Sequence, residues 1–483
     1  MSSELLKRID TRLMIGGDHV AAGDGSEFEV IDPATGEVIA MVASGTPEDA
    51  VAAVGAAYDA GPSWAATAPR ERGEILRRTF EMMIDRRDEI AEIIVLESGK
   101  SWNDAIGEVN YAAEFYRWFS EEAVRIDGGL MRAPSGDKHI ITMRQPVGVA
   151  VLVTPWNFPA AMATRKIGPA LAAGCTVVLK PASDTPLTAL LIAQMMKEAG
   201  VPDGVVNVLP SRRSGATVGA MLGDRRTRKV SFTGSTEVGV KLLEVAAQNV
   251  LNTSMELGGN APFLVFADAD LDAAVEGAMV AKMRNGGESC IAANRFLVEE
   301  PIVDAFADAL SARMAALKVG PGLVRHNDVG PVINQAAREE IHGLVDESVG
   351  AGAKVLTGGT LPDGPGFFYL PTVIRDVRPD AKLLRHEIFG PVAPIVAFNG
   401  EEEGIRMAND TEFGLASYVY TGDFGRAMRV SEGIDAGVVG VNRGFVSDPA
   451  APFGGNKLSG LGREGAHDGL LEFLETKYIA AQW

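Results

Sequence analysis

Residues 146–232 alternate between short apolar runs and helical patterns, and this alternation limits the fold more than any other feature of the chain. The segments are PVGVAVLV (146–153), CTVVLK (175–180), LTALLIAQMMKEAG (187–200), GVVNVL (204–209) and RKVSF (228–232). Short all-apolar strands that alternate with amphipathic helices predict a parallel sheet covered on both faces. We therefore expect a βαβαβ unit, which binds ligands outside the carboxyl ends of its strands.

Four polar or Gly/Pro-rich loops follow the predicted strands, where such a crevice would form. They are TPWNFP (154–159), KPASDTP (180–186), FTGSTEVG (232–239) and MELGG (255–259). Because the carboxyl ends of parallel strands share one edge of a sheet, we expect the four loops to converge on one site. FTGSTEVG alone is a weak dinucleotide signal, since it lacks the three-glycine fingerprint.

The rest of the chain predicts further units. A chain of 483 residues is too long for one hydrophobic core, and a second set of strands and helices runs from residue 260 to about residue 440. Residues 131–148 and 472–483 alternate like exposed strands, which often pair with another subunit. The expected fold class is α/β, with two α/β units and a small β element.

The charge balance limits the partners. Asp and Glu (64) outnumber Lys and Arg (45), for a net charge of −19, and no basic block stands clear of neighbouring acids. We expect no nucleic-acid and no membrane partner, because both attract basic surfaces. The first 17 residues lack the apolar segment of a leader, and no apolar run has the length of a membrane span. A cytoplasmic protein is therefore expected.

The chain has two cysteines, Cys175 and Cys290, too few for a disulfide framework. Cys175 starts an apolar run and is expected to be buried. Cys290 follows Arg284 and two glycines, a flexible approach that predicts an accessible thiol. A thiolate at Cys290 and a carboxylate at Glu256 are the minimum needed to make and then hydrolyse a thioester.

Seven motifs occur in one order along the chain. They are TPWNFP (154–159), KPAS (180–183), FTGS (232–235), MELGGNAP (255–262), GESC (287–290), HEIFGP (386–391) and PFGGNKLSGLGREG (452–465). Together they resemble the NAD(P)-dependent aldehyde dehydrogenase superfamily, over nearly the whole chain. The resemblance implies a homodimer or homotetramer built from three parts. These are a discontinuous Rossmann-like cofactor domain (1–123 and 147–258), a catalytic domain (259–440) and an oligomerisation element with the C-terminal tail (124–146 and 441–483).

The resemblance also assigns roles to single residues. Cys290 would attack the aldehyde carbon, the Asn157 amide and the Cys290 N–H would hold the oxyanion, and Glu256 would activate the hydrolytic water. The implied cofactor-binding residues are Trp156, Asn157, Lys180, Ser183, Gly234, Ser235, Leu257, Glu387 and Phe389. No metal site is implied.

The KPAS motif favours NADP as the cofactor, with NAD as a second acceptor. Ser183 stands where NAD-selective relatives often carry Glu, which would repel a 2′-phosphate, and Lys180 matches the residue that contacts the adenosine ribose. Arg212 and Arg213 follow the next strand. Either could pair with the phosphate, or both could be solvated surface charges.

Within the superfamily, residues 141–190 and 460–478 are most similar to the succinic semialdehyde dehydrogenases. This similarity places the substrate carboxylate at Arg165, Arg284 and Ser447, and the arginine fork suits a carboxylate. Both arginines could instead form salt bridges between elements. Arg443 and Asp448 put unexpected charges beside Ser447, so glutarate semialdehyde or another ω-acid aldehyde is the alternative substrate.

A cysteine-dependent thioester hydrolase or acyltransferase is the alternative from another class. Such enzymes usually pair the cysteine with a histidine, and the only histidine in a motif is His386, beside Glu387. A non-catalytic protein with this fold would be expected to have lost Cys290 or Glu256, and both are present.

Overall fold

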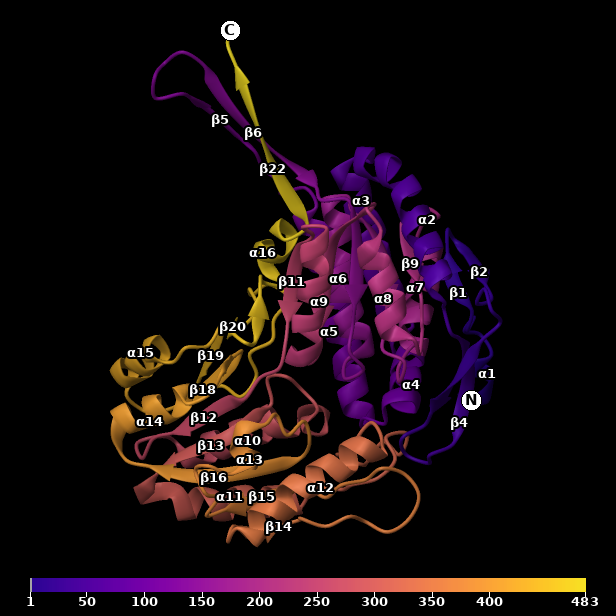
Figure 1. The fold of residues 1–483 in the computed structure, drawn as a ribbon. Coiled ribbons are helices and arrows are strands. Elements are labelled where there is room, and N and C mark those ends of the chain that lie inside the picture. The colour runs from indigo at the N-terminus through magenta and orange to yellow at the C-terminus, as the bar shows by residue number, and fades with distance from the viewer. Residues whose placement is uncertain (1) are drawn as a thin grey trace.

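Two large sheets organise the protein (Figure 1). The computed structural model describes residues 2–483. The first sheet has the order β2 (Asp18–Val20), β1 (Leu13–Ile15), β9 (Val206–Val208), β8 (Thr176–Lys180), β7 (Val149–Val153), β10 (Thr227–Thr233), β11 (Asn252–Glu256) and β21 (Gly460–Leu461). Its five central strands, from β9 to β11, are parallel, which confirms the predicted βαβαβ unit.

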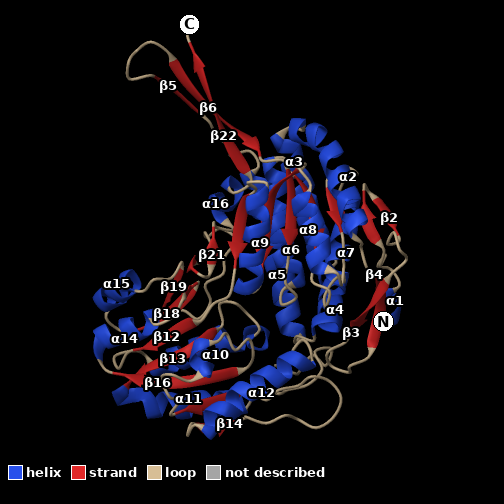
Figure 2. Ribbon diagram, in the orientation of Figure 1, coloured by secondary structure: helices blue, strands red, loops and turns tan. Residues whose placement is uncertain are grey.

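Helices cover both faces of this sheet (Figure 2). Ala150 and Leu152 of β7 pack into one apolar cluster, and Val149 and Val151 pack into another on the opposite face. One face is covered by α3 (Pro69–Asp85), α4 (Arg87–Ser98), α5 (Trp102–Glu122), α6 (Pro159–Ala173) and α7 (Leu187–Glu198), and the other by α2 (Pro47–Ala66), α8 (Ser214–Gly223) and α9 (Thr236–Gln248). Burial on both faces explains why these strands read as continuous apolar runs.

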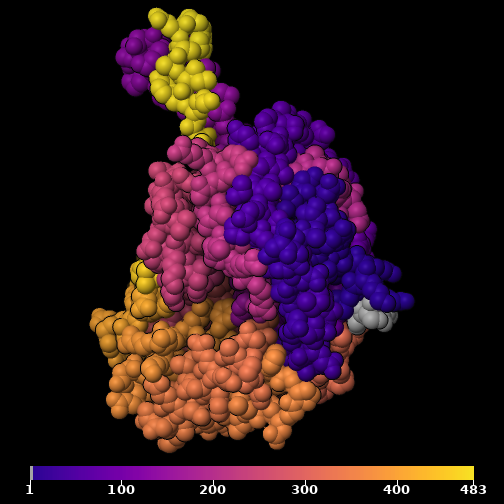
Figure 3. All heavy atoms as spheres, turned by 45° about the vertical axis from the view of Figure 1, so that its right-hand side comes forward, coloured from indigo at the N-terminus to yellow at the C-terminus, as the bar shows by residue number. Residues whose placement is uncertain are grey.

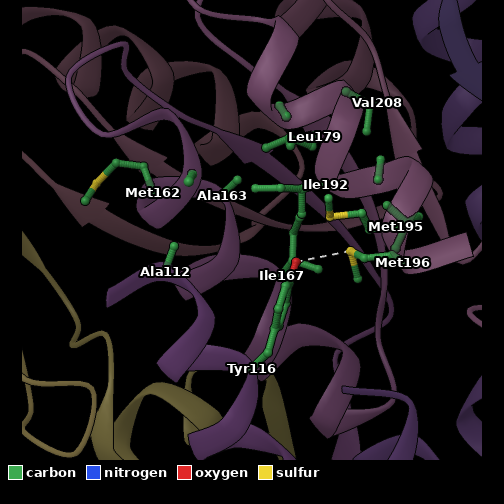
Figure 4. Close-up of a cluster of buried hydrophobic side chains, with 14 of the residues drawn as sticks. Ala112, Tyr116, Met162, Ala163, Ile167, Leu179, Ile192, Met195, Met196 and Val208 are labelled. Atoms are coloured by element: carbon green, nitrogen blue, oxygen red, sulfur yellow. Dashed lines mark hydrogen bonds between the residues drawn. The ribbon is translucent and has the colours of Figure 1, made fainter. Parts of the chain in front are cut away.

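Part of the first cluster fills the space between α5, α6 and α7 (Figure 4). The Tyr116 hydroxyl donates a hydrogen bond to Met196 Sδ (3.1 Å), so this buried hydroxyl is not left unpaired. Met162 stands at the edge of the cluster and also lines a cavity at the end of the sheet. The core of the first unit therefore reaches the edge where the site was expected.

The second sheet confirms the second predicted α/β unit. Its order is β14 (Lys354–Thr357), β15 (Thr372–Arg375), β16 (Val392–Phe398), β13 (Ala293–Glu299), β12 (Ala261–Val265), β18 (Ala416–Tyr420) and β19 (Val438–Val441), and only β14 is antiparallel to its neighbour. The helices of this unit are α10 (Leu271–Met283), α11 (Val303–Ala315), α12 (Gln335–Gly350), α13 (Lys382–Arg385), α14 (Gly400–Asn409) and α15 (Phe424–Gly433).

A three-stranded β arm stands away from the body, with the C-terminus at its tip (Figures 1 and 3). It consists of β5 (Gly129–Arg132), β6 (His139–Pro146) and β22 (Leu474–Ala481), all antiparallel. The two segments predicted as exposed strands thus pair with each other, in a register from Leu474 opposite Pro146 to Ala481 opposite His139. The outer edge of β22 has no partner strand within residues 2–483.

The remaining elements are short. They are α1 (Ser2–Leu6), the hairpin β3 (Glu27–Ile31) and β4 (Val38–Ala43), the pair β17 (Phe413–Gly414) and β20 (Asn456–Lys457), α16 (Ala466–Leu471), and 3-10 turns at Arg284–Gly287 and Glu300–Ile302. β21 brings the C-terminal segment back to the edge of the first sheet, against β11. Among the helices of residues 2–483, none has the length and apolar character to cross a membrane.

Candidate active site

A cavity of about 220 Å³ lies at the carboxyl ends of β7, β10 and β11, between the two units. It is lined by Pro155, Trp156, Asn157, Met162, Thr233, Gly234, Ser235, Leu257 and Gly258 from the first unit and by Cys290, Glu387 and Phe389 from the second. The structure therefore brings the candidate nucleophile together with most of the residues expected to hold the cofactor.

The other predicted site residues do not line this cavity. They are Glu256, Lys180, Ser183, Arg165, Arg284 and Ser447. The loop with Lys180 and Ser183 follows β8, one strand further along the sheet, and Thr185 Oγ1 of this loop donates to Trp156 O (3.4 Å). Three of the four predicted loops thus line the cavity, and the fourth adjoins it.

Cys290 follows a backbone turn that few residues can adopt. Asn285, Gly286 and Gly287 have positive φ angles of 56°, 60° and 83°, a region that suits glycine and, among other residues, asparagine. A Cβ atom on Gly287 would lie 2.3 Å from Gly390 O, so the loop that carries Glu387 packs directly on the backbone ahead of Cys290. Gly287 is therefore required by shape as well as by conformation, and Gly286 by conformation.

The thiol of Cys290 is held in its protonated form. Burial raises the pKa of this thiol to about 12; the Glu387 and Glu256 carboxylates add to the rise, and Arg165 and Arg284 oppose it. Only a thiolate is a strong nucleophile, so the reaction needs a base or an added positive charge beside the sulfur.

Asn157 is anchored to the loop that precedes Cys290. Its side-chain Nδ2 donates to Glu288 O (3.1 Å). Its backbone carbonyl accepts from Lys100 Nζ (2.6 Å) and Asn285 Nδ2 (3.0 Å). One amide hydrogen of Asn157 remains for another acceptor, since an amide nitrogen carries two. This placement is compatible with a donor to an oxyanion on Cys290.

Glu256 ends β11 and is buried, with no hydrogen-bond partner for its Oε2 atom in the described chain. Burial and the nearby Glu464 carboxylate raise the pKa of Glu256 well above its usual range. The loop after Glu256 reaches the nucleophile, because a Cβ atom on Gly259 would lie 2.3 Å from Cys290 O. A carboxyl with a raised pKa near a thiol is suited to accept a proton from water.

A buried group of charges surrounds Arg165. Glu464 Oε2 lies 2.7 Å from Arg165 Nε, and Lys166 Nζ donates to Glu464 Oε1 (2.5 Å) and to Ser231 Oγ (2.9 Å). The Arg165 guanidinium also lies 4.3 Å from the centre of the Phe453 ring. Arg165 is therefore paired with Glu464 through Nε, while its buried Nη2 atom has no hydrogen-bond partner within residues 2–483.

Arg284 is a different kind of cation. Its guanidinium lies 4.8 Å from the ring centres of Phe158 and Phe445 and 5.6 Å from that of Tyr111, and it forms no ion pair with any described residue. Ser447 is buried in the same loop as Phe445. Arg284 thus has a charge available for a ligand and aromatic walls that hold its plane.

Arg443 and Asp448, the two unexpected charged residues beside Ser447, both have hydrogen-bond partners within their own loop. Arg443 Nε donates to Phe445 O (2.6 Å), and Asp448 Oδ1 accepts from Ala450 N (2.9 Å). The side chain of His386 is exposed, and no histidine of the described chain lines the cavity. Within residues 2–483, no group of three or more His, Cys, Asp or Glu side chains is placed to hold a metal ion.

One part of the cavity lining has features that suit a dinucleotide. The rings of Trp156 and Phe389 meet edge to face, 5.3 Å apart, and Glu387 Oε1 accepts from Gly259 N (3.2 Å). Burial raises the pKa of Glu387 to about 8. Ser235 begins α9 without a side-chain cap, so the first amides of this helix are free to face a pyrophosphate.

The loop after β8 carries a cation and a small polar residue. Lys180 is buried, and burial lowers the pKa of its ammonium group to about 8. The Ser183 hydroxyl donates to Ser211 O (2.9 Å), which links this loop to the loop after β9. A carboxylate at position 183 would bring a negative charge beside Lys180, and the serine does not.

The two arginines of the next loop differ in their surroundings. Arg213 pairs with Asp24 (2.8 Å). Arg212 is exposed, lies 5.5 Å from the ring centre of Phe28 and has no carboxylate partner among the described residues, and its charge lowers the pKa of Lys180. Of the two arginines, only Arg212 lacks a carboxylate partner among the described residues, so only Arg212 is available to bind an anion beside Lys180.

Comparison with known proteins identifies this combination of thiol, amide, carboxylates and dinucleotide wall. The sequence profile of the Aldehyde dehydrogenase family matches residues 19–479. The chain belongs to the aldehyde dehydrogenase family. A succinate-semialdehyde dehydrogenase of Paenarthrobacter nicotinovorans is 56% identical over 442 residues, which are 92% of this chain and 98% of that protein.

Two further relatives support the same assignment. A glutarate-semialdehyde dehydrogenase of Pseudomonas putida is 48% identical over 465 residues, 96% of each chain. The crystal structure of an E. coli NADP-dependent enzyme matches with a TM-score of 0.97 at 44% identity and covers 100% of this chain and 99% of that one. The enzyme therefore oxidises an aldehyde to an acid with a nicotinamide cofactor, and the predicted fold and reaction class are confirmed.

Sequence reasoning missed three charged residues of this aldehyde dehydrogenase's site. Lys100, Lys166 and Glu464 are all buried and hydrogen-bonded around Asn157 and Arg165. Lys166 adjoins Arg165 and Glu464 lies in the motif PFGGNKLSGLGREG, so both stood in stretches already recognised. Lys100 had no such signal, because its role depends on a contact 57 positions along the chain.

Proposed function

We propose that this enzyme oxidises succinic semialdehyde to the dicarboxylate, with NADP⁺ as the preferred hydride acceptor. The observation that carries the substrate assignment is Arg284, in the loop that leads to Cys290, a cation that forms no ion pair in the described chain, although its charge reaches the Asp104 carboxylate. A substrate with a carboxylate at its far end would supply the missing charge. The names of the two semialdehyde dehydrogenases among the relatives support the same class of substrate.

In the proposed reaction, Cys290 gives up its proton to water, and its sulfur bonds to the aldehyde carbon as the C=O π bond breaks. The oxygen then carries a negative charge, which the free Asn157 amide hydrogen and the Cys290 N–H stabilise. Trp156, Glu387 and the first turn of α9 would hold NAD(P)⁺, which supplies the acceptor for the hydride that leaves this carbon. Glu256 takes a proton from water, the water oxygen bonds to the thioester carbon, and the C–S bond breaks to release the acid.

The roles proposed for the arginines differ. Arg284, with Ser447 nearby in the loop that packs on it, binds the substrate carboxylate. Arg165 contributes its free NH2 group to the same carboxylate and keeps Glu464 as its partner. This division rests on the ion pair that Arg165 has and Arg284 lacks within the described residues.

The proposed preference for NADP⁺ rests on Lys180, Ser183 and Arg212. Lys180 and Arg212 would supply two cations for a 2′-phosphate, against the one carboxylate of Asp184 near Lys180. A Glu at position 183 would add a second carboxylate and repel the phosphate. Arg213 is left out of this proposal because it pairs with Asp24. NAD⁺ remains a second acceptor, since the nicotinamide end of the site does not depend on the phosphate.

The proposal includes a homodimer or homotetramer held by the β arm. β22 presents an unpaired edge of eight residues, β19 is the edge strand of the second sheet, and Leu130, Met131 and Tyr478 are exposed on the arm. Edge strands of this kind pair with another chain. Light scattering should give a multiple of the 51.0 kDa chain mass, and a monomer at micromolar concentration would contradict this part.

A cytoplasmic location belongs to the same proposal. Cys175 and Cys290 are both free, which suits a reducing compartment. Cell fractionation with activity measurement would test it.

The test of the function is a set of initial rates over a panel of aldehydes with each cofactor. The panel contains succinic and glutaric semialdehyde, a neutral aldehyde of four carbons and a cationic amino aldehyde. We expect the highest kcat/KM for succinic semialdehyde with NADP⁺ and no turnover by Cys290→Ala. A higher value for glutaric semialdehyde would favour the second candidate, which the Pseudomonas putida relative supports; a higher value for the neutral aldehyde would refute the carboxylate assignment.

A further inference from the structure

A buried lysine far from the thiol in sequence touches the residue proposed to hold the oxyanion. Lys100 lies in the corner between α4 and α5, after Gly99, which ends α4 with a φ of 80°. This corner has little room to move, because a Cβ atom on Gly99 would lie 2.7 Å from Pro331 and 3.0 Å from Pro33. The backbone of Lys100 is therefore fixed by its surroundings.

The ammonium group of Lys100 has two strong acceptors. Its Nζ donates to Asn157 O (2.6 Å) and to Glu108 Oε2 (2.6 Å), and both side chains of this ion pair are almost fully buried. Charge-assisted hydrogen bonds of this length are about twice as strong as neutral ones. The Asn157 peptide is thus held by a cation whose own position is fixed.

Glu108 holds the start of the helix that follows this peptide. Its Oε1 accepts from Ala160 N (2.8 Å) and Ala161 N (3.2 Å), the first amides of α6. Phe158 begins this helix without a side-chain cap, so Glu108 on α5 serves in its place. One ion pair therefore fixes the carbonyl of Asn157 and the helix that starts two residues later.

The loop of Cys290 meets this ion pair at the same oxygen. Asn285 Nδ2 donates to Asn157 O (3.0 Å) and to Glu288 O (2.9 Å), and Asn157 Nδ2 donates back to Glu288 O. Lys100 thus sets the position of the Asn157 backbone. The side chain of Asn157 in turn bonds to the carbonyl of Glu288, two residues before Cys290. A buried ion pair adds little net stability compared with apolar packing, so stability alone gives no reason for a charge at this place.

We propose that Lys100, with Glu108 as its fixed counter-ion, is a positioning residue that holds the Asn157 amide where the oxyanion on Cys290 develops. This inference rests on the proposed role of Asn157. It predicts that the loss of Lys100 slows the steps that pass through the oxyanion, because a shift of about 1 Å in a catalytic group can cost about a hundredfold in rate.

The test compares Lys100→Met with Lys229→Met. Lys229 is a matched control, since it is also fully buried and hydrogen-bonded, to Asn252 and Ser254, but has no contact with Asn157. Both variants should lose thermal stability. Only Lys100→Met should lower the pre-steady-state rate of cofactor reduction, by about 10- to 100-fold, with the KM of the cofactor changed by less than about threefold.

A double-mutant cycle with Asn157→Ala separates positioning from a merely structural effect. Lys100→Met should add less than about a threefold loss in the Asn157→Ala background, because the group it positions is gone. Full additivity of the two losses, or a normal rate in Lys100→Met, would overturn the inference. If Lys100→Met does not fold, Glu108→Gln replaces it with the same expected pattern.

The Asn157→Ala variant alone separates the proposed oxyanion role of Asn157 from the proposed positioning role of Lys100. A normal rate in Asn157→Ala would overturn its proposed oxyanion role and the inference with it. A slow Asn157→Ala beside a normal Lys100→Met would overturn only the role of Lys100.

Discussion

Replacing Arg284 by methionine should weaken the reaction of a charged aldehyde and spare that of a neutral one. Arg284 has three aromatic neighbours and no ion pair in the described chain, so its charge has one proposed use, the substrate carboxylate. One charge-assisted hydrogen bond is worth about 1.5–3 kcal/mol, and about 1.4 kcal/mol is tenfold. We expect kcat/KM for succinic semialdehyde to fall by about 10- to 150-fold, mostly through KM.

The assay is the initial rate of NADPH formation with succinic semialdehyde and with butyraldehyde, a neutral aldehyde of the same length. Arg325→Met is the matched control, since Arg325 also lies over an aromatic ring, that of Trp102 (4.2 Å), but is not part of the loop that leads to Cys290. Arg165→Met should lower kcat for both substrates, because it removes the partner of Glu464 beside Glu256, and should in addition raise KM for succinic semialdehyde alone, because it removes a donor to the substrate carboxylate. Equal losses for both aldehydes in Arg284→Met would refute the reasoning.

Five further outcomes follow from the site. Ser183→Glu should lower the ratio of kcat/KM with NADP⁺ to that with NAD⁺ at least about tenfold, since a carboxylate repels the 2′-phosphate, and an unchanged ratio would contradict the proposed cofactor loop. The pKa of Lys180 is lowered to about 8, so its ammonium charge is present below pH 8 and lost above it. The same wild-type ratio should therefore fall between pH 7 and pH 9, whereas a flat profile would remove Lys180 from phosphate binding. Glu256→Gln should keep the first burst of NADPH but slow steady turnover by about 10²–10⁴, and normal turnover would exclude Glu256 as the base. Because the pKa of Glu256 is raised, wild-type hydrolysis of the thioester should speed up as pH rises. Peroxide should oxidise Cys290 itself, and mass spectrometry that finds a Cys175–Cys290 disulfide would contradict this.

The sequence predicted the fold well where burial dictates composition. The strands of the first sheet are covered on both faces, so they appear as apolar runs such as CTVVLK, and the loops at their carboxyl ends contain the polar residues. The convergence of these loops followed from the parallel order alone. The motifs around Cys290 and Glu387 then placed the second unit against the same edge.

The pairing of charges could not be predicted in this way. Arg165 and Arg284 had the same expected role in the sequence, yet the first is joined to Glu464, almost 300 positions away, and the second is free within the described chain. Lys100 had no expected role at all. Partners so distant in sequence are set by how two folded segments meet, which no local pattern records.

The contact between Gly287 and Gly390 restricts the movement of two loops of the site. The two backbones approach so closely that neither segment can advance without displacing the other. Glu387 and Phe389 sit on one side of this contact and Cys290 on the other. A displacement of the segment with Glu387 and Phe389 toward Gly287 would therefore meet the backbone ahead of Cys290.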